Sequence, residues 1–101
     1  MIRESDIEEN FVRYIHQLGG KSYKLKRHGQ RGWPDQTVFL PNRFGPLFIE
    51  LKRPKTGRPS QQQISQLIEL NKFGHPGLIT DSFDEAVTFV LEYVARNMDG
   101  P

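Results

Sequence analysis

Cysteine is absent from the sequence, which excludes a disulfide framework or a thiolate metal site and is compatible with a reducing compartment. Long apolar runs are absent too: no segment approaches the roughly 20 residues that cross a bilayer, and the N-terminus lacks the apolar region of a secretion signal. Net charge is small, because fourteen Lys and Arg against twelve Asp and Glu leave only +2. We therefore expect a cytoplasmic protein that does not bind membranes, whose charges are informative through their positions.

Apolar residues are limited as well. At 101 residues, of which 36% are hydrophobic, the chain can form one domain with a modest core. A monomer of this size can bury only a small apolar area. Self-association would therefore help to cover the surface that such a small core leaves exposed.

Two apolar stretches, 38–40 and 47–49, flank a turn at residues 42–45. Runs of this length predict strands that are buried on both faces, and the short turn predicts that they pair as an antiparallel hairpin. If Pro41 faces Pro46, residues whose numbers add up to 87 lie opposite each other.

Three charged side chains mark one end of this hairpin: Asp35 before the first apolar run, and Glu50 and Lys52 after the second. Side chains alternate between the faces of a strand, so Glu50 and Lys52 point the same way. The expected register places Asp35 opposite Lys52 and Thr37 opposite Glu50. All three charged groups then share one face of the sheet.

Two carboxylates and a lysine that converge at the end of a sheet can hold a hard divalent cation such as Mg²⁺. The ion acidifies an attacking water, and the lysine can orient or deprotonate that water or stabilise a pentavalent phosphate. The alternative is a hairpin closed by an ordinary ion pair. Burial of the flanking strands favours the metal site, because charges at the ends of such strands need a partner or a metal.

The order of these residues along the chain is specific. Gly32, Pro34 and Asp35 come first, Phe48-Ile49-Glu50-Leu51-Lys52 follows, and Ser60-x-x-Gln63 comes third. In this order the chain resembles the PD-(D/E)xK nuclease superfamily, and above all the small stand-alone VRR-Nuc domains of bacteriophages and bacteria. The resemblance extends from the first helix to the last. Residues 1–101 are therefore interpreted as a single VRR-Nuc-like nuclease domain.

The resemblance implies a Mg²⁺-dependent, structure-specific endonuclease that hydrolyses phosphodiester bonds in DNA, with Mn²⁺ able to substitute. It also implies a branched substrate such as a four-way (Holliday) junction, in a bacterium or a phage-infected cell. Asp35 and Glu50 would be metal ligands, Lys52 would position or activate water, and Gln63 would hydrogen-bond at the site. As a residue in a capping box, Gln63 also has a purely structural interpretation.

The first helix is expected to begin with a capping box, Ser5-Asp6-Ile7-Glu8, and to run to about Leu18, where two glycines end it. Glu8 lies at the edge of the apolar stripe of this helix, so its side chain can point toward the protein interior. The family resemblance implies that Glu8, with Phe11 three residues later, is a further metal ligand. Capping alone would also explain a glutamate at this position.

Basic residues cluster in two segments on either side of the hairpin. The first is a strand at 21–28 followed by a glycine-containing loop that includes His28 and Trp33, and the second is the proline-rich loop 53–59. Basic loops beside a phosphodiester-cleaving site suit contacts with DNA phosphates, although charge runs are also common on plain solvated surfaces. The candidate DNA-binding residues are Lys24, Lys26, Arg27, Arg31, Arg53, Lys55 and Arg58.

The remainder of the chain predicts a helix from Ser60 to about Phe73, a short buried strand at 78–80, and a helix from Ser82 to about Asn97. The element order is then α-β-β-β-α-β-α. We expect an α/β fold, a restriction-endonuclease-like sandwich in which a mixed central sheet is flanked by helices. The two motif strands should form the centre of that sheet.

Three other functions compete with a junction-cutting nuclease: a flap or nicking nuclease, a catalytically silent DNA-binding module of the same fold, and a structural partner in a phage replication complex. The candidate DNA-binding residues lie mainly on loops near the proposed cleavage site, not along a recognition helix that could read bases. Any DNA preference should therefore depend on DNA structure rather than on sequence.

The last helix carries more apolar surface than a one-sided surface helix needs. Its core stripe is widened by Phe89 and Tyr93 to an arc of roughly 200°. Either a small core uses this surplus internally, or a twofold homodimer covers it. A homodimer would place two identical active sites in symmetric relation, which suits paired incisions across a four-way junction.

Overall fold

The computed structural model describes residues 2–24, 34–41, 45–54 and 57–98. In this part of the chain the element order is the expected one. The elements are α1 (Glu4–Gln17), β1 (Lys21–Tyr23), β2 (Gln36–Phe39), β3 (Leu47–Leu51), α2 (Gln61–Lys72), β4 (Gly77–Thr80) and α3 (Phe83–Met98).

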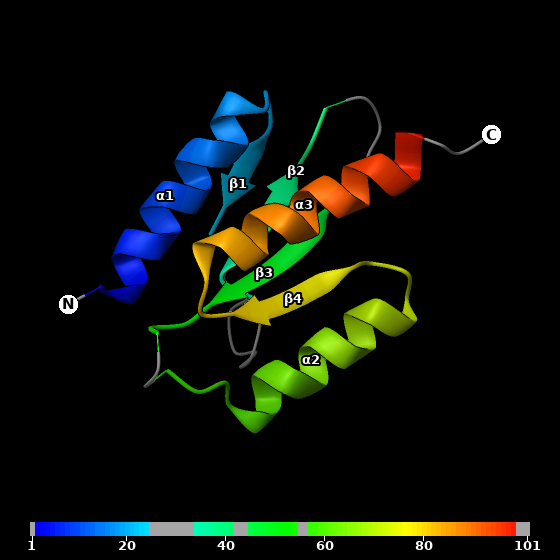
Figure 1. Ribbon diagram of the computed structural model, residues 1–101. Helices are drawn as coiled ribbons and strands as arrows, with labels where there is room; N and C mark the ends of the chain where they lie inside the picture. The colour runs from blue at the N-terminus through cyan, green and yellow to red at the C-terminus, as the bar shows by residue number, and fades with distance from the viewer. Residues whose placement is uncertain (1, 25–33, 42–44, 55–56, 99–101) are drawn as a thin grey trace.

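The four strands form one mixed sheet in the order β1-β2-β3-β4 (Figure 1). The pairs β1·β2 and β2·β3 are antiparallel, and β3·β4 is parallel. The motif strands β2 and β3 are central, as expected. A central position lets neighbouring strands and helices surround the charged groups that these two strands carry.

Helices cover both faces of the sheet, which confirms the sandwich. On one face α1 and α3 pack over the apolar side chains of the strands. On the opposite face α2 lies beside β4 (Figure 1), and a side chain at Gly77 would collide with Leu67 of α2. The buried core consists of Ile7, Phe11, Ile15, Val38, Leu40, Leu47, Ile49, Leu51, Ala86, Val90 and Tyr93.

The first helix begins earlier than expected. Arg3 is its N-cap, and the carboxylate of Asp6 accepts a hydrogen bond from the Arg3 N–H at 3.0 Å. The expected capping box from Ser5 to Glu8 is therefore wrong, because Asp6 caps the helix from its third position and moves the start to Glu4. The end is as expected: Gly19 adopts a φ of +84°, which favours glycine.

The other two helices begin where the sequence predicts. Ser60 Oγ accepts a hydrogen bond from the Gln63 N–H at 3.1 Å, and Gln63 Oε1 accepts one from the Ser60 N–H at 2.8 Å. Ser82 Oγ likewise accepts a hydrogen bond from the Glu85 N–H at 3.1 Å. These caps satisfy backbone donors that a helix start would otherwise leave without partners.

The register of the central hairpin differs from the expected one by two residues. Thr37 pairs with Phe48, so opposed residue numbers add up to 85, not 87. The connection is longer than a tight turn, because β2 ends at Phe39 and β3 begins only at Leu47. A shift of two residues keeps each side chain on its face, since side chains alternate with a period of two.

The shifted register changes which charged residues meet. Because Gln36 pairs with Ile49, the next position places Asp35 opposite Glu50. The expected pairings of Asp35 with Lys52 and of Thr37 with Glu50 are therefore wrong. The two motif carboxylates, rather than a carboxylate and the lysine, face each other across the strands.

Strands β1 and β4 differ from expectation, β1 in its length and β4 in its burial. The structure assigns β1 only to Lys21–Tyr23, so Lys24 follows the strand instead of belonging to it. Residues 25–28 of the expected strand, the basic loop and Trp33 lie outside the described residues. The strand β4 is less buried than expected, because only Thr80 is fully buried and the three residues before it are half-buried.

The apolar surplus of α3 is smaller than the sequence suggests. Tyr93 is only 9% exposed and belongs to the core, and Phe89 packs against that core. For these two residues the structure therefore favours the first alternative, in which the small core uses the apolar surplus internally. Leu91 is the large apolar side chain of α3 that remains half exposed. Among the described residues no helix has the length and apolar character needed to cross a membrane.

Candidate active site

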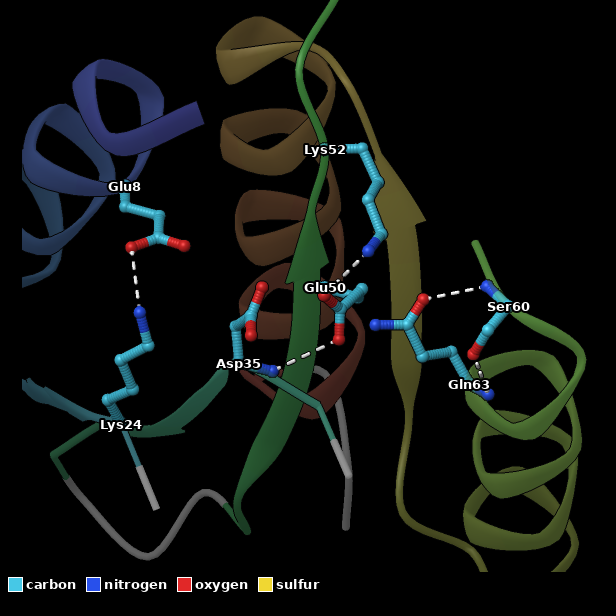
Figure 2. Close-up of polar contacts among 7 residues, drawn as sticks. All are labelled: Glu8, Lys24, Asp35, Glu50, Lys52, Ser60 and Gln63. Carbon is cyan, nitrogen blue, oxygen red and sulfur yellow. Dashed lines mark hydrogen bonds and ion pairs between the residues drawn. The ribbon is translucent and has the colours of Figure 1, made fainter. Parts of the chain in front are cut away.

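A hydrogen bond joins the main chain of Asp35 to the side chain of Glu50. Asp35 directly precedes β2, and its backbone N–H donates to Glu50 Oε1 at 3.2 Å (Figure 2). Glu50 lies near the end of β3 and is only 1% exposed. The sequence places this acid in an otherwise apolar strand, so folding the strand into the sheet buries the carboxylate.

Lys52 lies on the same face, as alternation along the strand predicts. Its Nζ is 3.4 Å from Glu50 Oε2, and its side chain is only 15% exposed. The Lys52 N–H donates to the Thr80 carbonyl at 2.9 Å, so β4 anchors the lysine backbone. The contact with Glu50 is an ion pair without hydrogen-bond geometry, and Oε2 of Glu50 has no hydrogen-bond partner in the described part of the chain.

The pKa of Glu50 is raised to about 8, mainly by burial and also by a side-chain hydrogen bond with Asp35 and the negative charge of Asp35. Lys52 acts in the opposite direction and lowers this pKa. A carboxyl group in this environment retains its proton near neutral pH. An additional positive charge at the site would favour the ionised form.

A third carboxylate comes from the first turn of α1. One carboxylate oxygen from each of Glu4, Asp35 and Glu50 lies within 4.8 Å of the other two. Glu4 was not among the predicted site residues, because the predicted first helix starts after this residue. A signal was present, since Glu4 precedes the buried Ile7 by three residues, as Glu8 precedes the buried Phe11.

Glu8, the expected ligand from this helix, points elsewhere. Lys24 Nζ lies 3.4 Å from Glu8 Oε2, and Figure 2 shows the two side chains directed toward each other. Partial burial raises the pKa of Glu8, Lys24 lowers it, and the charge of Asp35 raises it. Glu8 is therefore electrostatically coupled to Asp35, but its carboxylate is paired with Lys24.

Gln63 borders the site from α2. Its Oε1 accepts the hydrogen bond from Ser60 that caps the helix, and Figure 2 shows its amide nitrogen directed toward Glu50. The capping interaction leaves this amide group facing the carboxylates.

The candidate DNA-binding residues are only partly within the described chain. Lys24 is bound to Glu8, and the exposed Arg53 and Arg58 lie in the loop after β3. In this loop the Gly57 N–H donates to the Arg53 carbonyl at 2.9 Å, and Arg58 Nη1 donates to the Gly57 carbonyl at 3.1 Å. Outside the described residues lie Lys26, Arg27, Arg31 and Lys55.

The donor set at Glu4, Asp35 and Glu50 fits a hard divalent cation. All three groups offer carboxylate oxygens, which are the preferred ligands of Mg²⁺, Ca²⁺ and Mn²⁺, and no thiolate is available for a soft metal. The buried oxygen Glu50 Oε2, which has no hydrogen-bond partner among the described residues, is an additional indication, because such an atom is costly unless something binds it.

Comparisons with known proteins agree with this geometry. No protein-family model matches the chain. A protein named "Putative nuclease p44", from Acyrthosiphon pisum secondary endosymbiont phage 1, is 37% identical over 84 residues, which cover 83% of this chain and 88% of that protein.

Two solved structures have the same fold. One, described as "VRR_NUC domain", superposes with a TM-score of 0.81 at 26% identity and covers 92% of this chain and 99% of its own. The other, described as "VRR_NUC domain protein", has a TM-score of 0.75 over 94% of this chain and 90% of its own, and at 14% identity it supports the fold alone. The chain therefore belongs to the VRR-Nuc family and is a nuclease.

Proposed function

We propose that this nuclease is a Mg²⁺-dependent endonuclease that hydrolyses phosphodiester bonds in DNA. The observation that carries the proposal is the meeting of three carboxylates, from Glu4, Asp35 and Glu50, of which Glu50 also has a buried oxygen, Oε2, without a hydrogen-bond partner among the described residues. A lysine lies beside this oxygen, so the group that could act on water or phosphate adjoins the group that could hold the ion.

Each side chain has a distinct proposed role. Glu4, Asp35 and Glu50 would hold Mg²⁺, which when bound would lower the pKa of a water and offset the negative charge of the phosphate. Lys52 would orient the water or stabilise the phosphate oxygens. Gln63 would donate a hydrogen bond from α2.

Glu8 is proposed to support this site from its edge. Its ion pair with Lys24 joins α1 to the chain just after β1. Burial is the main reason that the pKa of Glu8 is raised, and the charge of Asp35 raises it as well, so the two acids repel each other. We therefore place Glu8 beside the ligands rather than among them.

The proposed substrate is branched DNA, such as a four-way junction, in a bacterial or phage-infected cytoplasm. The exposed arginines Arg53 and Arg58 lie in the loop after β3, the strand that carries Glu50, so they can contact phosphates beside the cleaved bond. The other proposed DNA contacts are Lys24, Lys26, Arg27, Arg31 and Lys55. Affinity should fall steeply with salt, because phosphate contacts release counterions.

We also propose that the protein acts as a homodimer. The half-exposed Leu91 on α3 supports this, since a second copy could cover it. Light scattering at micromolar concentration should give about twice the chain mass, and Leu91→Glu should give a monomer. Leu18→Glu, at the exposed residue that follows α1, is the matched control. A monodisperse wild-type monomer that still makes symmetric cuts in junctions would contradict this proposal.

The decisive experiment compares the wild type with Asp35→Ala, Glu50→Ala and Lys52→Ala on junction, flap, splayed-arm, nicked and linear DNAs, with Mg²⁺ or Mn²⁺. Each variant should lose cleavage while remaining folded. Asp84→Ala, which removes an exposed acid from α3, should cleave normally. Full activity in any of the three site variants overturns the assignment, and a strong preference for flaps would identify a flap nuclease instead.

A further inference from the structure

One buried hydroxyl has no role in the site described so far. The side chain of Thr37, in β2, is only 4% exposed. Its Oγ1 has no hydrogen-bond partner among the described residues, and of the buried side-chain nitrogen and oxygen atoms in that part of the chain only Glu50 Oε2 shares this property. Nonpolar valine has nearly the same shape, so the hydroxyl is a net cost to folding unless it binds something.

A second buried threonine shows the ordinary arrangement. Thr80 is 5% exposed, and its Oγ1 accepts a hydrogen bond from the Ser82 N–H at 3.0 Å. Its hydroxyl therefore caps the end of β4. The contrast indicates that a buried hydroxyl in this fold can find a partner within the protein, and that Thr37 Oγ1 does not.

The register places Thr37 beside the carboxylates. Thr37 is two positions after Asp35 and thus on the same face of β2. It pairs with Phe48, two positions before Glu50, so Thr37 and Glu50 are diagonal neighbours on that face. Diagonal neighbours have Cα atoms about 7–8 Å apart, so one water molecule can bridge their polar atoms.

Glu50 needs such a support. Its Oε1 is fixed by the Asp35 N–H, but among the described residues its Oε2 has the ion pair with Lys52 and no hydrogen bond. Rotation about the last side-chain bond of Glu50 is therefore weakly restrained. A hydroxyl both donates and accepts, so Thr37 can hold a bridging water for either protonation state of the carboxyl group.

We propose that Thr37 is a positioning residue: its hydroxyl binds one ordered water that bridges to the Glu50 carboxylate and sets the orientation in which Glu50 binds the divalent ion. This inference rests on the proposed metal-dependent function. It assigns a functional purpose to a polar atom that otherwise only destabilises the fold.

The test uses Thr37→Val, which removes only the hydroxyl, and Thr37→Ser, which keeps it. Mn²⁺ affinity is measured by calorimetry, and cleavage is measured across a range of Mn²⁺ concentrations. Thr37→Val should bind Mn²⁺ about tenfold more weakly, as expected when a group that orients a ligand is lost. Cleavage should recover at high Mn²⁺, and Thr37→Ser should remain close to wild type in both measurements.

Unfolding of the metal-free proteins separates this role from a structural one. Thr37→Val should have a Tm equal to or above that of the wild type. The control Thr80→Val should have a lower Tm, because it leaves the Ser82 N–H without its acceptor, and should keep its Mn²⁺ affinity. If Thr37→Val does not fold, Thr37→Ala provides the same comparison.

Two results overturn the inference: wild-type Mn²⁺ affinity in Thr37→Val, or an equal loss of affinity in Thr37→Ser. Failure of the underlying function has a different signature, because the wild type itself would then neither bind Mn²⁺ nor cleave DNA.

Discussion

The backbone N–H of Asp35 donates a hydrogen bond to Oε1 of Glu50 at 3.2 Å. The main chain of one acidic residue thus holds the side chain of the other. This brings two carboxyl groups together at a position where Glu50 is almost fully buried. Two ionised carboxylates this close together in a buried site repel each other, so the site favours a proton or a metal ion.

The stability of the metal-free protein should fall as pH rises. Burial and Asp35 raise the pKa of Glu50 from its ordinary 4.5 to about 8. Between these values the folded protein keeps a proton that the unfolded chain has lost, so the free energy of unfolding decreases with pH. Urea unfolding in EDTA should show a decrease on the order of 2 kcal/mol between pH 5 and pH 8.

Glu50→Gln should remove most of this decrease and be more stable than the wild type at pH 8. Glu69→Gln, at an exposed position on α2, serves as the control and should retain the wild-type profile. Parallel pH profiles for the wild type and Glu50→Gln would show that Glu50 is not the group responsible.

Metal binding should release a proton. At pH 7 the raised pKa of Glu50 keeps the carboxyl group largely protonated, and a divalent ion requires the ionised form. Affinity for Mn²⁺ should therefore rise with pH between 6 and 8, by up to about tenfold per unit. Calorimetry in buffers of different ionisation enthalpy measures the released proton. Release should vanish at pH 9, and an absence of buffer dependence at pH 7 would refute the coupling.

Glu4 should matter more for metal affinity than Glu8. The Glu4 carboxylate lies with those of Asp35 and Glu50, whereas that of Glu8 is paired with Lys24. Glu4→Gln should weaken Mn²⁺ binding by about tenfold or more, and Glu8→Gln should weaken it less. Calorimetry of the two variants, both on the same helix, provides a matched comparison. The reverse order would assign the ligand to Glu8.

Gly57→Ala should impair cleavage without unfolding the core. A Cβ at Gly57 would lie 2.6 Å and 2.7 Å from backbone atoms of Arg53 and 3.0 Å from Cβ of Lys52. The turn after β3 must open to admit it, and Lys52 would shift with the turn. Because small displacements of such groups are costly, single-turnover cleavage should slow by roughly 10- to 100-fold.

Gly74→Ala is the control for this variant. Gly74 has a φ of +87° and no atom within 4 Å of an added Cβ, so alanine there is strained but meets no neighbour. It should lose about 1 kcal/mol of stability and cleave normally. Equal cleavage by Gly57→Ala and the wild type would show that Lys52 does not depend on this turn.

The sequence by itself determined the element order and the identity of most elements. Ser60 and Ser82 mark helix starts because their hydroxyls satisfy specific backbone donors nearby. The shared face of Glu50 and Lys52 follows from alternation along one strand. These features depend on interactions between residues close in sequence, so local patterns are sufficient to predict them.

Only the tertiary structure decided how the elements meet. The two-residue shift that places Asp35 opposite Glu50 depends on the length of the connection between β2 and β3, and no periodicity encodes that length. Which glutamate of α1 lies close to Asp35 and Glu50 depends on where α1 lies relative to the sheet. That the buried hydroxyl of Thr37 has no hydrogen-bond partner among the described residues is likewise a feature of the folded structure alone. Each of these features joins residues far apart in sequence, and packing of the whole chain is what brings them together.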